Sequence, residues 1–333
     1  MTTTPDLLIL ESSWKRLESR IRQVVPDIRA SVMDDRGSVT VDGETVPVEK
    51  LRSTLGWLNL DAYESPARRD YFRALLEIES LQWVQTAAAG VDDPTFAQLV
   101  RKGITLTNSD SQAPAIADFI LAAALDFFQH QDERRELQAA RNWQKVPFLE
   151  MSDTSWLIVG YGHIGRETAR RAAAFSASIT GIRRQESEKD EFAHQVATLD
   201  RLPQLLPHAD VVVLSIALNE ATRNLANAEF FARMKPGSLL VNIGRGGLVD
   251  EPALLEALQR DAPGRAVLDV FHTEPLPQDS PLWNHPKIRV TAHASNVGSG
   301  TRRRGDELFL DNLRRYMRGG ELRNPAKRGD LSS

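Results

Sequence analysis

The chain has 333 residues, a length that corresponds to about two domains. Its 41 Lys and Arg residues nearly balance its 45 Asp and Glu residues, so the net charge of −4 gives no reason to expect a nucleic-acid or anionic-membrane partner. Cysteine is absent, which excludes disulfides, thiolate metal ligands and cysteine nucleophiles. We expect no metal centre, and a globular protein with a sizeable core.

The N-terminal part of the chain predicts a small α/β unit. A strand is expected at 6–10 and an amphipathic helix at 12–25, and further strands are expected at 56–60, 81–86 and 103–108. The first residues, MTTTPDLLILESSW, lack a basic segment before a long apolar run, so we expect no signal peptide and a cytoplasmic protein. The apolar stretch at 113–128 contains two Asp residues and is too short to cross a bilayer, which favours a buried helix opening near Pro114 over a membrane span.

From residue 155 on, short apolar strands alternate with helices. Strands are expected at 155–160, 178–182, 210–217, 238–244, 265–271 and 287–293. Helices are expected at 164–175, 201–206, 228–234 and 250–260, the last with Asp250 as N-cap. Apolar strands separated by helices predict a parallel sheet covered on both faces. A last amphipathic helix at 306–320 is expected to pack back onto the first domain.

A glycine-rich turn, GYGHIG, stands between the first strand and the first helix of this series. Gly160 suits a tight turn, Gly162 the approach of backbone to a pyrophosphate, and Gly165 close helix–strand packing. The helix N-terminus adds free N–H groups and a positive dipole end for phosphates. The pattern predicts an α/β protein with two Rossmann-like domains and parallel sheets. The dinucleotide-binding domain is expected at 115–300, and the smaller substrate domain is built from both chain ends, 1–114 and 301–333.

Two arginines follow the next strand, in the sequence SITGIRRQ. Dinucleotide sites commonly carry an acidic residue here that accepts a hydrogen bond from the adenosine ribose. Arg183 and Arg184 instead offer a donor fork to a 2′-phosphate, which predicts a preference for NADP over NAD. The alternative is a pair of solvated surface arginines.

Three segments follow expected strands of the same sheet, namely VNIGRGGLVDEPALLEAL, LDVFHTEPLP and VTAHASNVGSG. Ligands of open α/β sheets bind beyond the carboxyl ends of the strands, which places Arg245, Glu274 and His293 near a nicotinamide. Each residue alone has an ordinary explanation, as a loop charge, a turn residue and a buried core histidine. Together, after a glycine-rich turn, they indicate a catalytic site.

The combination NIGRGGLVDE, DVF, EPLP, SPLW and TAH resembles the D-isomer-specific 2-hydroxyacid dehydrogenase family. The similarity runs from about 81–93 to 312–324 and is strongest over 155–295. Within the family, SPLWNHP and EPLP look most like the glyoxylate/hydroxypyruvate reductase-like branch. The resemblance implies hydride transfer between NADP(H), or NAD(H), and a small 2-oxo or 2-hydroxy acid, and a homodimer in which the apolar helix near 115–128 takes part.

The family's catalytic order matches Arg245, Glu274 and His293. Reduction of a 2-oxo acid needs a proton at the keto oxygen, which a protonated His293 can give, while Glu274 stabilises the imidazolium. Arg245 can hold the substrate carboxylate and stabilise the developing oxyanion. The resemblance also implies that backbone N–H groups of Ala89, Gly90 and Val91 bind the carboxylate; the alternative is an ordinary strand-to-helix turn. The positions expected at the cofactor are Gly160, Gly162, His163, Ile164, Gly165, Arg183, Arg184, Ile216, Ile243, Gly244 and Asp269.

Two other functions remain open at this point. One is a dinucleotide-sensing interaction protein that resembles the C-terminal-binding corepressors, which keep a dehydrogenase-like site. The other is an NAD-dependent phosphoglycerate-type dehydrogenase, which needs a basic pocket for a substrate phosphate.

Asp269 also has two possible roles. Its counterpart in the family contacts the nicotinamide side of the cofactor, and the alternative is an acceptor of N–H groups at the strand end.

Overall fold

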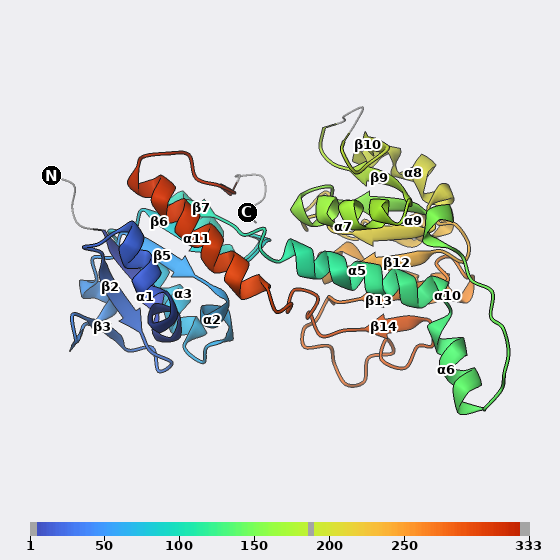
Figure 1. Cartoon of the computed structure of the whole chain (residues 1–333), viewed down its shortest axis with the longest axis horizontal. Coiled ribbons are helices and arrows are strands. Elements are labelled where there is room, and N and C mark those ends of the chain that lie inside the picture. The colour runs from blue at the N-terminus through green and yellow to red at the C-terminus, as the bar shows by residue number, and fades with distance from the viewer. Residues whose placement is uncertain (1–4, 186–189, 327–333) are drawn as a thin grey trace. The chain divides into compact units, whose positions relative to one another are not determined.

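The computed structural model describes residues 5–185 and 190–326. Their contacts divide into two compact units (Figure 1). Unit 1 contains the described residues up to Gln112 and those from Ser299 onwards, and unit 2 is Ala113–Gly298. The outermost ends of the predicted smaller domain, 1–4 and 327–333, lie outside the described residues.

Unit 1 is built around a seven-stranded sheet with the order β4-β3-β2-β1-β5-β6-β7. Its strands are β1 (Asp6–Leu10), β2 (Arg29–Met33), β3 (Val39–Val41), β4 (Glu44–Thr45), β5 (Leu55–Leu58), β6 (Trp83–Thr86) and β7 (Thr105–Thr107). Its helices are α1 (Glu11–Val24), η1 (Val48–Lys50), α2 (Leu60–Glu64), α3 (Arg68–Glu77), α4 (Pro94–Arg101) and α11 (Thr301–Met317). The five strands β2, β1, β5, β6 and β7 are parallel to one another, as the sequence predicted.

The edge of this sheet differs from the prediction, because β3 and β4 run antiparallel. The two strands are joined by Asp42 and Gly43, with φ values of 53° and 85°. Two consecutive residues with positive φ form the tight turn whose twist suits a hairpin. The hairpin therefore extends an otherwise parallel sheet by two short antiparallel strands.

Helix α11 returns the C-terminal segment to unit 1, as predicted. Phe309 on this helix stacks on Trp57 of β5, with ring centroids 4.8 Å apart, and on Trp83 of β6 at 5.8 Å. All three rings are almost fully buried, so α11 completes the core on one face of the sheet. This packing explains how residues from both ends of the chain form one unit.

Unit 2 contains a second seven-stranded sheet, in the order β10-β9-β8-β11-β12-β13-β14, with all strands parallel. Its strands are β8 (Ser155–Val159), β9 (Ser178–Ile182), β10 (Gln195–Ala197), β11 (Val211–Leu214), β12 (Leu239–Asn242), β13 (Arg265–Leu268) and β14 (Ile288–Val290). Its helices are α5 (Ala113–Phe128), α6 (Gln131–Ala139), η2 (Met151–Asp153), α7 (His163–Ala174), η3 (Leu199–Arg201), α8 (Leu202–Leu205), η4 (Leu206–His208), α9 (Ala228–Arg233), η5 (Gly246–Leu248) and α10 (Glu251–Gln259). The chain order reverses between β8 and β11, which is the switch point where such sheets bind their ligands.

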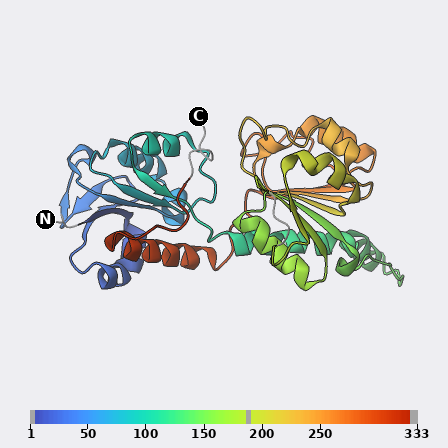
Figure 2. The ribbon, with the colours of Figure 1, turned by 90° about the horizontal axis from the view of Figure 1, so that it is seen from above.

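Helices cover both faces of the second sheet, as predicted. Figure 2 shows α5 and α7 (green) on one face and the helices between β10 and β13 (yellow to orange) on the other. Separate apolar clusters fill the two layers. Asp250 caps α10 by accepting a hydrogen bond from the N–H of Ala253 at 3.0 Å, which confirms the predicted N-cap.

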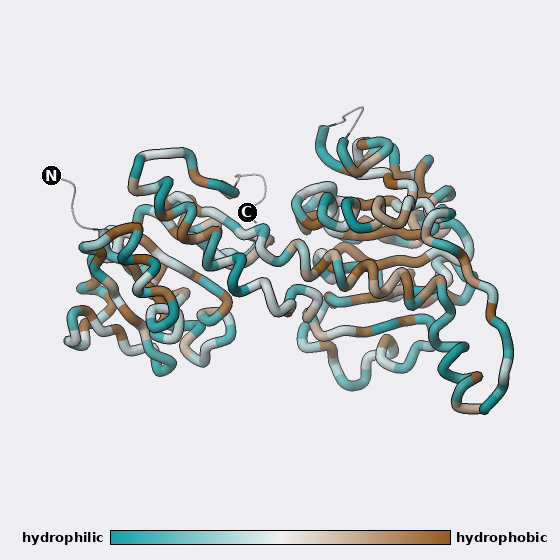
Figure 3. The backbone as a smooth tube through the Cα atoms, in the orientation of Figure 1, coloured by the Kyte–Doolittle hydropathy of each residue, from teal (hydrophilic) through white to brown (hydrophobic). Residues whose placement is uncertain are grey.

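The predicted buried helix is α5, which is predominantly hydrophobic in Figure 3 and packs against α7. The following helix, α6, is hydrophilic along its length and buries none of its residues. Within the described ranges, no helix combines the length and apolar character needed to cross a membrane.

Candidate active site

The glycine-rich turn joins β8 to α7 at the switch point. Gly160 has a φ of 106°, and a Cβ built on it would lie 2.4 Å from the carbonyl carbon of Ser215 and 2.5 Å from the N of Ile216. The hydroxyl of Ser215 donates to the carbonyl of Gly160 at 2.8 Å. Only glycine fits this position, because both the backbone conformation and the close approach of the segment after β11 exclude a side chain.

The other two glycines differ in what surrounds them. A Cβ on Gly165 would lie 2.4 Å from the carbonyl oxygen of Gly160, so this glycine allows α7 to pack tightly against the turn. Gly162 is the N-cap of α7, and no atom of the described protein lies within 4 Å of a Cβ built there. Of the two residues that follow it, His163 is exposed and Ile164 is half-buried. Packing within the described chain therefore does not explain the glycine at position 162.

The segment after β9 carries the two predicted arginines. Arg183 is half-buried, its N–H donates to the carbonyl of Ala197 at 3.0 Å, and its Nε donates to the carbonyl of Gln185 at 2.8 Å. Arg184 is exposed. Both residues stand directly beyond the carboxyl end of β9, next to the glycine turn, whose Tyr161 N–H donates to the carbonyl of Ile182 at 2.7 Å.

Arg245 is held on a tightly packed loop beyond β12. The amide of Asn242 donates to the carbonyl of Arg245 at 3.0 Å, and its oxygen accepts from the N–H of Gly244 at 3.1 Å. A Cβ on Gly246 would lie 1.9 Å from the carbonyl carbon of Phe271, so the loop packs directly against the segment after β13. The half-buried guanidinium donates to the carbonyl of Gly244 through Nη1 at 2.7 Å.

Glu274 and His293 form a direct pair between the loops after β13 and β14. The Nδ1 atom of His293 lies 2.8 Å from Oε2 of Glu274, and Oε1 of Glu274 accepts from the N–H of Phe271 at 3.0 Å. The side chain of His293 is 46% exposed and that of Glu274 36% exposed. The second ring nitrogen of His293 is therefore available to a ligand at the surface while the first is held by a carboxylate.

Asp269 fixes the loop that carries His293. Its carboxylate is fully buried and accepts hydrogen bonds from the hydroxyl of Thr291 at 2.7 Å, the N–H of Ala294 at 2.8 Å and the hydroxyl of Ser295 at 2.5 Å. The carbonyl of Asp269 accepts from the N–H of His293 at 2.8 Å. Asp269 thus accepts N–H and O–H groups at the strand end, and its contact with a cofactor stays a prediction.

The remaining predicted cofactor positions converge on the same edge of the sheet. A Cβ built on Gly244 would lie 3.1 Å from the carbonyl oxygen of Ile216, and the N–H of Ile243 donates to the carbonyl of Leu214 at 3.2 Å. The loops after β8, β11 and β12 are therefore in mutual contact. Within unit 2, the structure brings the glycine turn, Arg245, Glu274 and His293 to the carboxyl edge of one sheet.

The predicted substrate loop belongs to unit 1, between β6 and α4. Asn108 donates through its amide to the carbonyl of Ala89 at 2.8 Å, and the side chain of Val91 is buried in the core. In the described chain, the N–H groups of Ala89, Gly90 and Val91 meet no protein acceptor. Free N–H groups on a loop held from its carbonyl side suit an anionic ligand.

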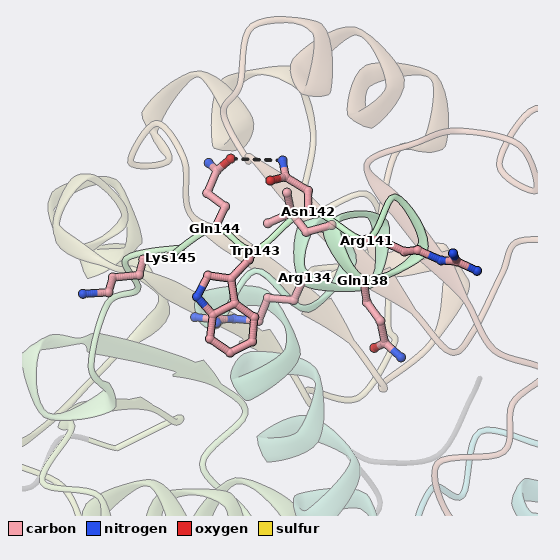
Figure 4. A pocket seen from close by; sticks show the side chains of 8 residues that line it. Arg134, Gln138, Arg141, Asn142, Trp143, Gln144 and Lys145 are labelled. Atoms are coloured by element: carbon pink, nitrogen blue, oxygen red, sulfur yellow. Dashed lines mark hydrogen bonds between the residues drawn. The ribbon is translucent and has the colours of Figure 1, made fainter.

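Several residues that shape this site escaped the sequence analysis: Tyr161, Asp190, Asn242, Gly246 and Ser295. Of these, Gly246 carried a usable signal, since it belongs to the glycine-rich sequence GRGG beside a candidate catalytic arginine. A concavity between α6 and the segment after it, lined by Arg134, Gln138, Trp143 and their neighbours, contains none of the predicted site residues (Figure 4). The described residues also contain no group of three or more side chains suited to a metal ion.

A glycine turn at the switch point and an acid–histidine pair at the neighbouring strand ends are features of a nicotinamide-dependent dehydrogenase. The family model described as D-isomer specific 2-hydroxyacid dehydrogenase, NAD binding domain, matches residues 121–295. The chain belongs to this family. It is therefore an oxidoreductase, an NAD(P)-dependent D-2-hydroxyacid dehydrogenase or 2-oxo acid reductase, as the sequence predicted.

Individual relatives cover most of this dehydrogenase. Glyoxylate/hydroxypyruvate reductase B of Escherichia fergusonii is 34% identical over 261 residues, which span 75% of this chain and 80% of the relative. A D-isomer specific 2-hydroxyacid dehydrogenase from Xanthobacter autotrophicus, solved in complex with NADPH and MES, matches with a TM-score of 0.78 and 25% identity over 97% of this chain and 98% of that one. D-3-phosphoglycerate dehydrogenase of Methanocaldococcus jannaschii is 28% identical over 72% of this chain, but the match spans only 46% of that protein.

Proposed function

We propose that this dehydrogenase acts mainly as a reductase of small 2-oxo acids, with NADPH as the preferred cofactor. The observation that carries the proposal is the pair of His293 and Glu274, with Nδ1 and Oε2 2.8 Å apart, at the carboxyl edge of the sheet that holds the glycine turn. A histidine held in this way is the group that an oxo-acid reductase needs for its proton transfer.

The geometry of the pair supports Nε2 of His293 as the source of the proton. Because Nδ1 of His293 faces Glu274, the proton given to the keto oxygen is the one on Nε2. Glu274 stays oriented through the N–H of Phe271 and stabilises the imidazolium until the proton leaves. In the direction of alcohol oxidation the neutral ring takes the proton back at the same atom. A bound nicotinamide supplies or accepts the hydride.

Arg245 is the proposed anchor for the substrate. A guanidinium offers a planar fork that matches a carboxylate, and it also stabilises negative charge developing on the keto oxygen. The N–H groups of Ala89, Gly90 and Val91 are the proposed second contact with the carboxylate. A substrate that is held by its carboxylate presents a fixed carbon to the hydride, which lowers the entropic part of the barrier.

The residues of unit 2 fit a dinucleotide. Gly162 stands at the N-terminus of α7, where no described protein atom would touch a side chain, so its backbone suits the close approach of a pyrophosphate. His163 and Ile164 would lie beside that pyrophosphate, and Ile216, Ile243 and Gly244 would line the nicotinamide side. Arg183 and Arg184 stand beyond β9, where the adenosine ribose is bound in this fold.

The preference for NADPH rests on these two arginines. Arginine donates charge-assisted hydrogen bonds to a 2′-phosphate, whereas an acidic residue at this position would repel it. The bond from Arg183 Nε to the carbonyl of Gln185 keeps the side chain close to the strand end where the ribose would lie. The Xanthobacter relative, which was solved with NADPH, is consistent with this preference.

Substitution Arg183→Ala should weaken NADPH binding by about 10- to 100-fold, because charge-assisted hydrogen bonds to the phosphate are lost. NADH, which lacks the phosphate, should bind as before. Fluorescence titration of both reduced cofactors measures the effect. Arg233→Ala, which removes an exposed arginine of α9, is the matched control. Tighter binding of NADH by the wild type, unaffected by Arg183→Ala, would contradict the proposal.

The activity itself is tested by following NADPH and NADH oxidation with glyoxylate, hydroxypyruvate, pyruvate and bulkier 2-oxo acids. We expect the smallest acids to be reduced fastest, and we expect a higher rate with NADPH than with NADH. The same panel includes 3-phosphoglycerate with NAD, because a phosphoglycerate dehydrogenase appears among the relatives. Turnover of only the phosphorylated substrate would favour that alternative. No turnover with any acid, combined with tight cofactor binding, would favour a dinucleotide-sensing protein.

The homodimer stays a prediction that rests on the family resemblance. Beyond α6, the segment that contains Trp143, Phe148 and Leu149 exposes all three of these large apolar side chains. Exposed apolar groups of this size are typical of protein–protein contacts and support a homodimer, but they lie outside the helix near 115–128 that was expected to take part.

A further inference from the structure

The glycine turn contains an aromatic residue that the proposed function does not use. Tyr161 stands between Gly160 and Gly162, and it is 4% exposed. Its ring covers the end of β9 so closely that a Cβ on Gly181 would lie 2.5 Å from the ring atoms Cγ and Cδ2. The turn that faces the pyrophosphate is therefore in direct contact with the strand that leads to the arginines.

The hydroxyl of Tyr161 donates to Oδ1 of Asp190 at 2.8 Å. Asp190 has two further partners. The N–H of Phe192 donates to Oδ1 at 3.2 Å, and Nη1 of Arg166 lies 3.2 Å from Oδ2. The side chain of Asp190 is only 8% exposed. Both oxygens of this carboxylate therefore have partners within the protein.

Arg183 directly follows Gly181 and Ile182 in the chain. Tyr161 contacts both of these residues, Gly181 through its ring and Ile182 through its N–H, which donates to the carbonyl at 2.7 Å. Burial and the hydrogen bond to Asp190 raise the pKa of Tyr161, while the charges of Arg166 and Arg183 act in the opposite direction. Arg183 is also fixed at its backbone by the carbonyl of Ala197. Tyr161 thus connects the glycine turn with the end of β9 directly before Arg183, and Asp190 connects Tyr161 with Arg166 in the first turn of α7.

We infer that Tyr161 and Asp190 are positioning residues for cofactor specificity: their hydrogen bond, supported by the ion pair of Asp190 with Arg166, holds the Tyr161 ring against the end of β9 and so positions Arg183 for a 2′-phosphate. The inference rests on the proposed preference for NADPH and deepens it. The hydrogen bond fixes the ring that packs on Gly181, two residues before Arg183. The charge of Arg166 offsets that of a carboxylate that would otherwise repel the phosphate.

Removal of the tyrosine hydroxyl alone tests the hydrogen bond to Asp190 without disturbing the packing of the ring. Tyr161→Phe keeps the ring over Gly181 but deletes the donor to Asp190. We expect the NADPH-over-NADH preference, measured as the ratio of dissociation constants, to fall by about 10-fold. The Michaelis constant for NADPH should rise, while kcat at saturating NADPH stays within about two-fold of the wild type, because the catalytic residues are untouched.

Tyr316→Phe is the matched control, since it removes a tyrosine hydroxyl of α11 that donates to Gln82 of unit 1 at 2.7 Å. It should leave both cofactor constants unchanged. Asp190→Asn serves as a second variant: it keeps an acceptor for Tyr161 and removes a negative charge, so we expect the NADPH preference to be retained. Thermal unfolding of each variant confirms that it is folded.

The outcomes distinguish this inference from the proposed function. A wild type without NADPH preference overturns both the proposed preference and the inference built on it. A wild type that prefers NADPH, with the preference unchanged in Tyr161→Phe, overturns the inference alone. Equal weakening of NADPH and NADH in Tyr161→Phe also overturns it, because the hydroxyl would then support the whole glycine turn rather than the recognition of the phosphate.

Discussion

Substitution His293→Asn should lower kcat for 2-oxo acid reduction by about 1,000-fold, because the variant has no group that can give a proton to the keto oxygen. Asparagine retains a polar side chain, and the backbone of the loop remains held by Asp269, whose carbonyl accepts from the N–H of residue 293. NADPH affinity should therefore survive. Pre-steady-state mixing of variant and cofactor, followed by single-turnover reduction, separates binding from the chemical step.

The comparison needs a histidine outside the proposed site. His208 is exposed in η4, just before the amino end of β11 and thus at the opposite edge of the sheet, so His208→Asn should keep wild-type turnover. The kcat of Glu274→Gln should lie between those of His293→Asn and His208→Asn. The amide oxygen still accepts from Nδ1 but carries no charge to stabilise the imidazolium. Near-wild-type turnover in His293→Asn would refute the assigned role.

Much of the fold follows from local sequence patterns. The short apolar runs of β8, β11 and β12 are almost entirely buried, which makes parallel central strands easy to predict. The hairpin of β3 and β4 was missed although the sequence contains its signal, the Asp42–Gly43 pair that adopts positive φ in the turn. Helix α6 lacks a buried face, so no apolar periodicity marks it.

The candidate site shows a similar division. Parallel strands bring their carboxyl ends to one edge, so an arginine, a glutamate and a histidine after three consecutive strands could be grouped from the sequence alone. The contacts that hold these three side chains in place could not be predicted from the sequence. That Gly246 packs on Phe271, or that Asp269 accepts from Thr291 and Ser295, depends on the register between neighbouring strands, which is a property of the folded sheet.

Substitution Arg245→Ala should lower kcat/KM for the oxo acid by about 100- to 1,000-fold, through both a higher KM and a lower kcat. Both constants are affected because the guanidinium is proposed to bind the carboxylate in the ground state and the oxyanion in the transition state. The loop itself should persist, since Asn242 bonds to the backbone of residue 245 and Gly246 fixes the packing. Steady-state kinetics with glyoxylate and hydroxypyruvate measures the loss.

Chemical rescue shows whether the guanidinium itself is what the reaction needs. Free guanidinium ion should restore part of the activity of Arg245→Ala, while Arg245→Lys should recover binding better than catalysis, because an ammonium group is a point charge without the planar fork. Arg260→Ala, at an exposed arginine that follows α10, should behave like the wild type. If Arg245→Ala loses NADPH affinity in parallel with activity and guanidinium restores neither, Arg245 supports the cofactor loop and the assignment to substrate fails.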